Sequence, residues 1–169
     1  FQGYDAEEWS TFSDNKLNFD QDTFSVKGQL PNMTNIDNVK LVKGFYNKSI
    51  PKFIENNNID TNNKYFSCIH IDCDTYSAIM DIFNGMQKWF IKGTIIVFDD
   101  IVGISGINHA TKALYEFEKN YLKKHNLKIK WLYCGKGPNT YSVLDRGCVL
   151  THILFAYRYG YFSASLIVE

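Results

Sequence analysis

Hydrophobic positions along the chain fall into two kinds of segment. Two nearly continuous apolar runs, Tyr65 to Ile71 and Thr94 to Phe98, are typical of strands that are covered on both faces. After each run, apolar residues recur at intervals of three and four, which predicts two amphipathic helices. These positions are Ile79, Met80, Ile82, Phe83, Met86, Trp89 and Phe90 in the first helix, and Ile107, Ala110, Leu114, Phe117 and Tyr121 in the second. With a further strand at Lys128 to Cys134, the order predicts an α/β fold with a mostly parallel sheet and helices on both faces.

The ends of the chain are less regular than its middle. Residues 1–38 are rich in Asp, Asn, Ser and Gly, which predicts mostly loop. Residues 39–136 form the expected α/β core, whereas residues 137–169 show no clean period. Within them, Leu150 to Val168 is apolar but interrupted by polar side chains, which favours strands or core segments over a membrane span. We therefore expect a single domain over residues 1–169.

Two short elements are expected at the start of this core. Val39 to Val42 alternates weakly and ends near Gly44, which predicts a short strand. Ser49 is a good helix cap, and Pro51 suits the first turn of the helix that would follow it.

Composition narrows the partners of the protein. The 18 basic and 18 acidic side chains of the 169 residues cancel, so no overall charge favours nucleic acid or an anionic membrane. The four cysteines are Cys68, Cys73, Cys134 and Cys148, and their wide spacing argues against a zinc site or a disulfide framework. Cysteines inside an apolar strand suit a reducing compartment, so we expect a cytoplasmic protein.

Four aspartates follow the two apolar strands. Asp72 and Asp74 come directly after the first strand, and Asp99 and Asp100 end the second. Ligands of open α/β sheets bind beyond the carboxyl ends of the strands, where these side chains would converge. A single aspartate there more often caps a helix or contacts solvent, but matching pairs after two strands favour a shared site. Carboxylates held together repel one another unless a cation compensates them, which predicts Mg²⁺ or another hard divalent ion.

The sequence resembles the macrocin O-methyltransferase family, which includes sugar O-methyltransferases of antibiotic biosynthesis. The resemblance spans roughly Phe1 to Lys136 and is specific as a combination of four motifs. They are Phe1-Gln2-Gly3; Leu41-Val42-Lys43-Gly44-Phe45 followed by Ile50-Pro51; Ile69-His70-Ile71-Asp72-Cys73-Asp74-Thr75-Tyr76; and Lys92-Gly93-Thr94-Ile95-Ile96-Val97-Phe98-Asp99-Asp100.

The resemblance implies a Rossmann-like methyltransferase fold and a magnesium ion held by Asp72, Asp99 and Asp100, with Asp74 as the general base. It also implies S-adenosylmethionine as cofactor, a small-molecule hydroxyl on a sugar as acceptor, and a homo-oligomer, since related enzymes often associate. The family's glycine-rich cofactor loop and its acidic partner would lie upstream of Phe1. We therefore expect a partial domain that lacks its first strands and its cofactor-binding residues, and that is inactive by itself.

Tyr76 and His109 are candidates for the substrate pocket. Tyr76 opens the first helix, where a tyrosine equally often packs locally with its hydroxyl hydrogen-bonded. His109 follows the Asp99-Asp100 loop, although a histidine on a first helical turn is more often a capping or solvent-exposed residue.

Three other functions fit parts of the pattern. Asp72-Cys73-Asp74-Thr75 also suits a haloacid-dehalogenase-like phosphatase with Asp72 as nucleophile, but only one helix and one strand fit between Asp74 and Asp99. A manganese-dependent glycosyltransferase uses Asp-x-Asp as well, yet it does not require a second strand that ends in Asp-Asp. A non-catalytic methyltransferase-like interaction module is the third alternative.

Overall fold

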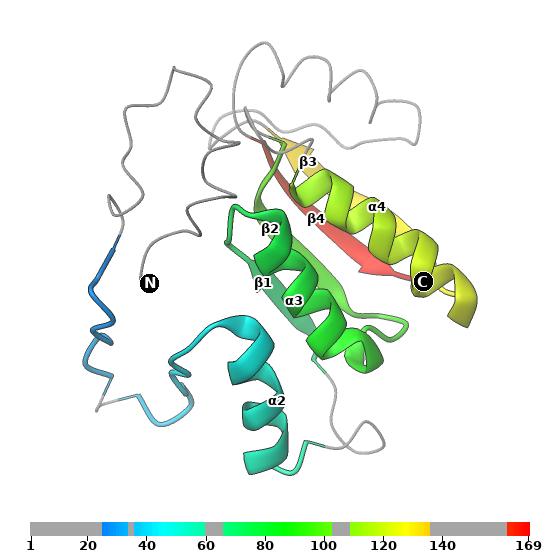
Figure 1. Cartoon of the computed structure of the whole chain (residues 1–169). Coiled ribbons are helices and arrows are strands. Elements are labelled where there is room, and N and C mark those ends of the chain that lie inside the picture. The colour runs from blue at the N-terminus through cyan, green and yellow to red at the C-terminus, as the bar shows by residue number, and fades with distance from the viewer. Residues whose placement is uncertain (1–24, 34–35, 60–65, 103–108, 136–161) are drawn as a thin grey trace.

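The computed structural model describes residues 25–33, 36–59, 66–102, 109–135 and 162–169 (Figure 1). Strands and helices alternate along the chain from β1 to β3, as the sequence predicts. The helices are α2 (Tyr46–Asn56), α3 (Tyr76–Met86) and α4 (Ala110–Asn120), with 3-10 turns η1 (Gln87–Trp89) and η2 (Leu122–His125). The strands are β1 (Cys68–Ile71), β2 (Ile95–Val102), β3 (Ile129–Gly135) and β4 (Phe162–Val168).

The four described strands form one sheet in the order β1-β2-β4-β3. β1 and β2 are parallel, whereas β4 runs antiparallel to both β2 and β3. β1, β2 and β3 therefore share one direction, and β4 lies between β2 and β3 in the opposite direction (Figure 1). This mixed sheet confirms the α/β fold class, and β4 confirms that the apolar end of the chain contains a strand.

The core lies between the sheet and two helices. Figure 1 shows α3 and α4 side by side on the same face of the sheet. Phe83 of α3 is fully buried and stacks on Phe117 of α4, with ring centroids 4.3 Å apart. On the other face of β1, Cys68 and His70 are exposed, so helix cover is seen on one face within the described ranges. Cover of the second face remains a prediction.

α2 packs against α3, and its start differs from the sequence prediction. It begins at Tyr46, so Ser49 lies inside the helix and Pro51 lies in the second turn. The backbone turns at Gly44, whose φ of 136° favours glycine, and this lets the helix begin earlier than a Ser49 cap would. The predicted strand at Val39–Val42 is wrong, because this segment has no partner in the described sheet and its apolar side chains are exposed.

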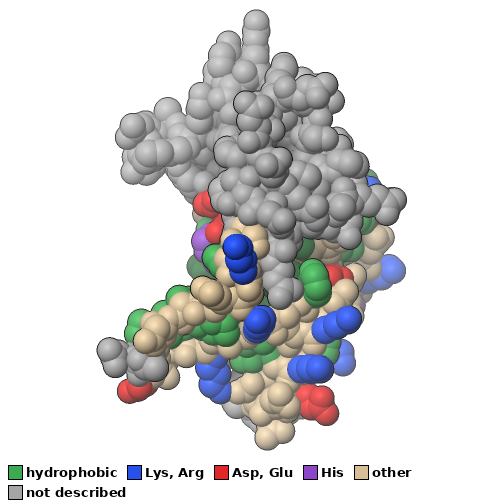
Figure 2. Space-filling model, turned by 60° about the vertical axis from the view of Figure 1, so that its left-hand side comes forward, with side chains coloured by type: hydrophobic (Ala, Val, Ile, Leu, Met, Phe, Trp, Pro, Cys, Tyr) green, Lys and Arg blue, Asp and Glu red, His purple; other side chains and the backbone are tan. Residues whose placement is uncertain are grey.

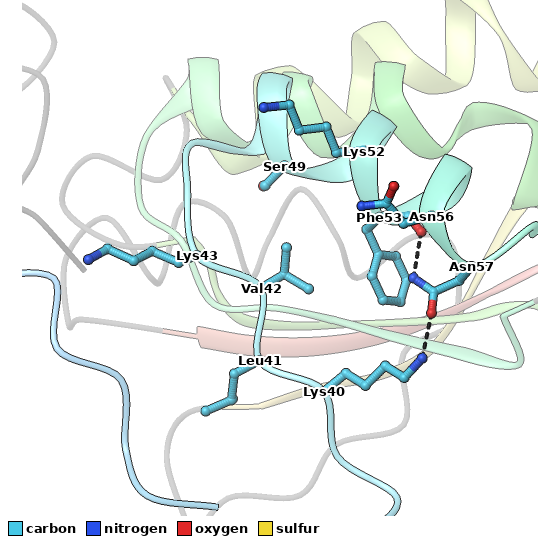
Figure 3. A pocket seen from close by; sticks show the side chains of 9 residues that line it. All are labelled: Lys40, Leu41, Val42, Lys43, Ser49, Lys52, Phe53, Asn56 and Asn57. Atoms are coloured by element: carbon cyan, nitrogen blue, oxygen red, sulfur yellow. Dashed lines mark hydrogen bonds between the residues drawn. The ribbon is translucent and has the colours of Figure 1, made fainter.

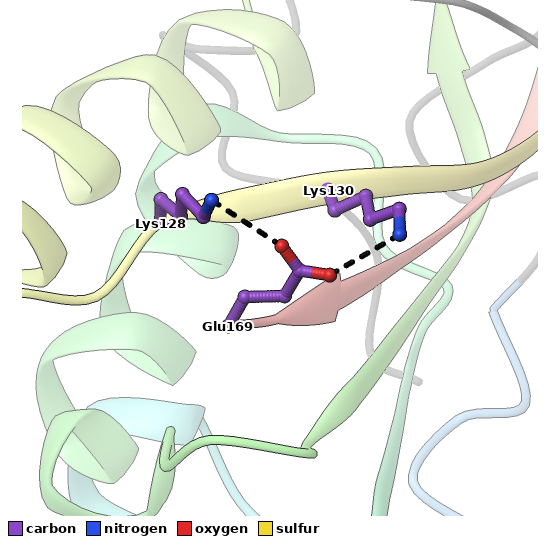
Figure 4. Close-up of polar contacts among 3 residues, drawn as sticks. All are labelled: Lys128, Lys130 and Glu169. Carbon is purple, nitrogen blue, oxygen red and sulfur yellow. Dashed lines mark ion pairs between the residues drawn. The ribbon is translucent and has the colours of Figure 1, made fainter.

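The amino-terminal end of the β2 strand is tied to the end of the chain. Gly93 donates its N–H to the Val168 carbonyl at 2.8 Å. The Glu169 carboxylate lies 3.5 Å from the Lys128 ammonium and 3.3 Å from that of Lys130 (Figure 4). These contacts hold β3 and β4 together at the edge opposite to the acidic motifs. Among the helices described, none has the length and apolar character that a membrane crossing requires.

Candidate functional site

The register of β1 against β2 brings two of the predicted aspartates to neighbouring positions. The last register pair is Ile71 with Phe98, and both side chains are buried. Asp72 and Asp99 are the next residues along the two chains, and both are exposed. Asp72 lies in the loop directly after β1, whereas Asp99 lies within β2. The two aspartates therefore take neighbouring positions along the chain beyond the last register pair.

The second acidic motif does not end its strand, which corrects the sequence prediction. β2 continues through Asp99 and Asp100 to Val102. Its pairing with β4 is irregular over this stretch, because the register shifts between Phe98 and Val102. An irregularity of this kind re-aims side chains locally, and such bulges are common beside active sites. The sequence did not predict this continuation, because the polar pair Asp99-Asp100 is typical of a strand end. In the structure, Ile101 and Val102 extend the strand beyond this pair.

The loop that carries Asp72 and Asp74 is fixed by the start of α3. Thr75 is buried, and its hydroxyl accepts the Ala78 N–H at 3.4 Å, so it caps the helix. Asp74 immediately precedes this cap and is half-buried. The unpaired N–H groups at a helix start favour negative charge nearby, which suits a loop of two carboxylates.

His109 joins the loops that follow β1 and β2. It is 4% exposed, and its Nδ1 accepts the backbone N–H of Tyr76 at 2.9 Å. The ring therefore satisfies a first-turn donor of α3, although His109 itself lies at the start of α4. Acceptance by Nδ1 requires the proton of the neutral ring to lie on Nε2. His109 is buried and makes no side-chain capping bond on its own helix, so it is neither the solvent-exposed nor the capping residue that the sequence suggested for α4; it caps the neighbouring α3 instead.

Tyr76 is bound by residues of α4. Its hydroxyl donates to the Glu116 carboxylate at 2.5 Å, and the Lys112 ammonium lies 4.4 Å from the centre of its ring. The hydrogen bond to Glu116 raises the pKa of Tyr76, with burial and the Glu116 charge adding to the effect. This is the local packing that the sequence offered as the alternative to a pocket role. A role of Tyr76 or His109 in binding substrate stays a prediction.

Tyr46 adds a phenol that the sequence did not single out. Partial burial raises the pKa of Tyr46, which is still 39% exposed, and the charges of Cys73 and Asp72 raise it further. The first residue of α2 is therefore within electrostatic range of the loop after β1, and its hydroxyl is protonated at neutral pH. The available signal was its position next to Gly44-Phe45 in one of the four family motifs.

The donor set fits a hard divalent cation in part. Asp72 and Asp99 supply carboxylate oxygens at adjacent positions, which is the chemistry that Mg²⁺ prefers. The third predicted ligand, Asp100, lies on β2, but its side chain is outside the described residues. Among the side chains that are described, no three His, Cys, Asp or Glu residues are grouped closely enough to hold a metal ion. The assignment of Asp72, Asp74, Asp99 and Asp100 therefore stays a prediction.

Comparison with known proteins gives a likeness of fold. No protein-family model matches the chain, and no curated protein does. The calicheamicin methyltransferase CalS11 aligns with 18% identity and a TM-score of 0.41, over 63% of this chain and 37% of that chain. An apo structure of CalS11, described as a TDP-rhamnose 3'-O-methyltransferase of calicheamicin biosynthesis, aligns with 17% identity and a TM-score of 0.38, over 63% and 41%. The chain thus spans about two fifths of the length of these proteins, and likeness at this level carries no argument about activity.

Proposed function

We propose that the chain forms part of an O-methyltransferase. The enzyme would use S-adenosylmethionine and Mg²⁺ to methylate a hydroxyl group of a small molecule, and we propose a sugar as that molecule. The observation that supports the proposal is the β1–β2 register, in which Asp72 and Asp99 directly follow the last pair, Ile71 with Phe98. The choice of methyl transfer and of a sugar rests on the resemblance of the four sequence motifs to sugar O-methyltransferases.

The electrostatics of the edge are consistent with this reaction. Asp72 and Asp99 would hold the cation together with Asp100, while the start of α3 partly balances the negative charge of the loop. A bound Mg²⁺ would make a neighbouring hydroxyl more acidic, and S-adenosylmethionine would supply the methyl group.

Asp74 is the proposed general base. It follows Asp72 by two residues and precedes the capped start of α3. The same short loop therefore carries both the general base Asp74 and the proposed metal ligand Asp72. Asp74 would accept the hydroxyl proton as the acceptor oxygen forms its bond to the methyl carbon and the carbon–sulfur bond breaks. The Tyr46 phenol, which lies near Asp72, is suited to orient the acceptor by donating a hydrogen bond.

The phosphatase alternative is disfavoured by the connection between the two acidic motifs. Residues 66–102 are described without a gap, and only α3 and η1 lie between β1 and β2. β1 and β2 are also direct neighbours in the sheet. Such a phosphatase inserts a further strand that ends in Ser or Thr, and a catalytic lysine, between its acidic motifs. The segment between β1 and β2 contains no such additional strand.

Calorimetry of S-adenosylmethionine binding tests the proposal, with and without Mg²⁺, on this chain and on a version extended upstream. We expect binding by the extended protein and, with a sugar acceptor, methyl transfer that depends on Mg²⁺. Asp74→Asn should slow transfer by about 100-fold or more, since a general base contributes on this scale. Asp37→Asn, an exposed aspartate before α2, is the matched control and should change nothing. Absence of cofactor binding in both folded proteins would overturn the proposal and favour the interaction module.

A further inference from the structure

A cavity of about 430 Å³, open to solvent and lined mostly by exposed residues, lies between the segment 40–43 and α2 (Figure 3). Its volume is within the range of small-molecule sites, which runs from roughly 300 to 1,000 Å³. Leu41, Val42 and Phe53 supply apolar surface on its walls. None of the proposed metal ligands lines it, so it is a separate feature of the molecule.

Among the described residues that line the cavity, the charged ones are all positive. Lys40, Lys43 and Lys52 are among the nine residues that line it, and none of the nine is acidic. Figure 3 shows the side chains of Lys43 and Lys52 extending to one side, whereas Lys40 extends to the other side, toward Asn57. Figure 2, which turns this side of the molecule forward, shows basic side chains spread over the face. Because like charges repel, an anion near Lys43 and Lys52 would be favoured.

One of the lysines is held in place by the protein. The Lys40 ammonium donates a hydrogen bond to Asn57 Oδ1 (Figure 3). Asn57 is itself fixed, because its Nδ2 donates to the Phe53 carbonyl at 2.7 Å. Lys40 therefore adds an oriented positive charge at the Asn57 end of the cavity, on the side opposite to Lys43 and Lys52. Lys43 and Lys52 are exposed and supply the remaining two charges.

We infer that this cavity binds a small molecule that bears a phosphate or diphosphate group, with the apolar part of the ligand against Val42 and Phe53. A small ligand is favoured over a nucleic acid because the net charge of the chain is zero and the basic groups surround a cavity of limited volume. The inference goes beyond the proposed methyltransferase function and does not depend on it.

Titration of the full chain with inorganic pyrophosphate tests the inference, in the absence of S-adenosylmethionine and divalent ions. Calorimetry and two-dimensional NMR should report binding, with the largest shifts at backbone amides of Lys43 and Lys52. The double variant Lys43→Gln/Lys52→Gln should weaken binding by about tenfold or more, because it removes two of the three positive charges that line the cavity. Lys119→Gln/Lys123→Gln makes the same change of charge on exposed residues outside the cavity and should alter the affinity less than about twofold.

Each other outcome overturns the inference. The inference is overturned if the wild-type protein does not bind pyrophosphate at millimolar concentration. It is also overturned if both double variants lose affinity equally, because that result would indicate general charge attraction. Unchanged binding by a folded Lys43→Gln/Lys52→Gln variant would place the anion elsewhere. Since no cofactor is present, none of these results bears on methyl transfer, and loss of methyl transfer would leave this test unaffected.

Discussion

Replacing Thr75 should separate two contributions to the start of α3, the helix that fixes the acidic loop. Its hydroxyl accepts the Ala78 N–H, and its methyl group is buried with the rest of the side chain, which is 6% exposed. Thr75→Val keeps the shape of the side chain and removes the hydroxyl. Thr75→Ser keeps the hydroxyl and removes only the methyl group.

The structure sets the size of each effect. Loss of a helix cap costs about 0.5–2 kcal/mol, and the 3.4 Å distance from the hydroxyl to the Ala78 nitrogen places Thr75→Val in the lower half of that range. Loss of a buried methyl group in Thr75→Ser costs about 1 kcal/mol. Both variants should therefore lower the melting temperature by a similar 2–4 °C, so stability alone does not distinguish them.

Hydrogen exchange at the Ala78 amide distinguishes the two variants. In Thr75→Val this N–H loses its acceptor, and a cap worth 0.5–1 kcal/mol corresponds to exchange about two to five times faster. In Thr75→Ser the exchange rate of Ala78 should stay within the error of the wild-type rate. Unchanged exchange in Thr75→Val, or an equal increase in Thr75→Ser, would refute the assignment of Thr75 as the cap.

Other contacts give further predictions. Tyr76→Phe removes the hydrogen bond to Glu116 and should lower the free energy of unfolding by about 1 kcal/mol in urea denaturation, because this part of the molecule is partly solvated; no change would show that the bond contributes nothing. Phe83→Ala leaves a hole against Phe117 and should cost about 3–5 kcal/mol in the same assay, so a loss below 1 kcal/mol would contradict the described core. The raised pKa values of Tyr46, through burial, and Tyr76, through its bond to Glu116, mean that the folded state holds these protons more tightly than the unfolded state. The stabilisation is therefore retained below about pH 10 and is lost as the pH rises further. Thermal melts from pH 8 to 11 should show a smaller fall in melting temperature in the Tyr46→Phe/Tyr76→Phe variant than in the wild type.

The parts of the fold that could be predicted are those in which burial imposes a period. The spacing of Ile79, Ile82 and Phe83 predicted α3 because all three side chains face the core. The same reasoning predicted Val39–Val42 as a strand, and there it failed, because a weak alternation does not specify a partner. Strand pairing is a long-range property, and this segment has no pairing within the described sheet.

The sequence located the aspartates relative to the strands but not their surroundings. Each buried run is followed by a carboxylate, and Asp72 and Asp99 directly follow the last register pair, Ile71 with Phe98. That they form one site stays a prediction. The acceptance of the Tyr76 N–H by His109 joins residues 33 positions apart, and no local pattern encodes it. The closeness of Tyr46 to Asp72 likewise depends on how α2 packs on α3.

The placement of β4 between β2 and β3 could not be read from the sequence either. Its run from Phe162 to Val168 alternates between buried and half-buried residues where it is described, which identifies a strand. Its neighbours and its antiparallel direction are long-range properties of the sheet, which the local pattern of its residues does not encode.

Binding of Mn²⁺, measured by electron paramagnetic resonance as a substitute for Mg²⁺, tests the central claim that Asp72 and Asp99 form part of one cation site. We predict that Asp72→Asn and Asp99→Asn each weaken binding by about tenfold or more, since even groups that only support a metal ligand change affinity by 10- to 100-fold. Asp74→Asn and the distant Asp37→Asn should leave the affinity within about twofold of wild type. Equal loss in Asp72→Asn, Asp74→Asn and Asp99→Asn would contradict the assigned roles, and wild-type affinity in folded Asp72→Asn and Asp99→Asn would contradict the site itself.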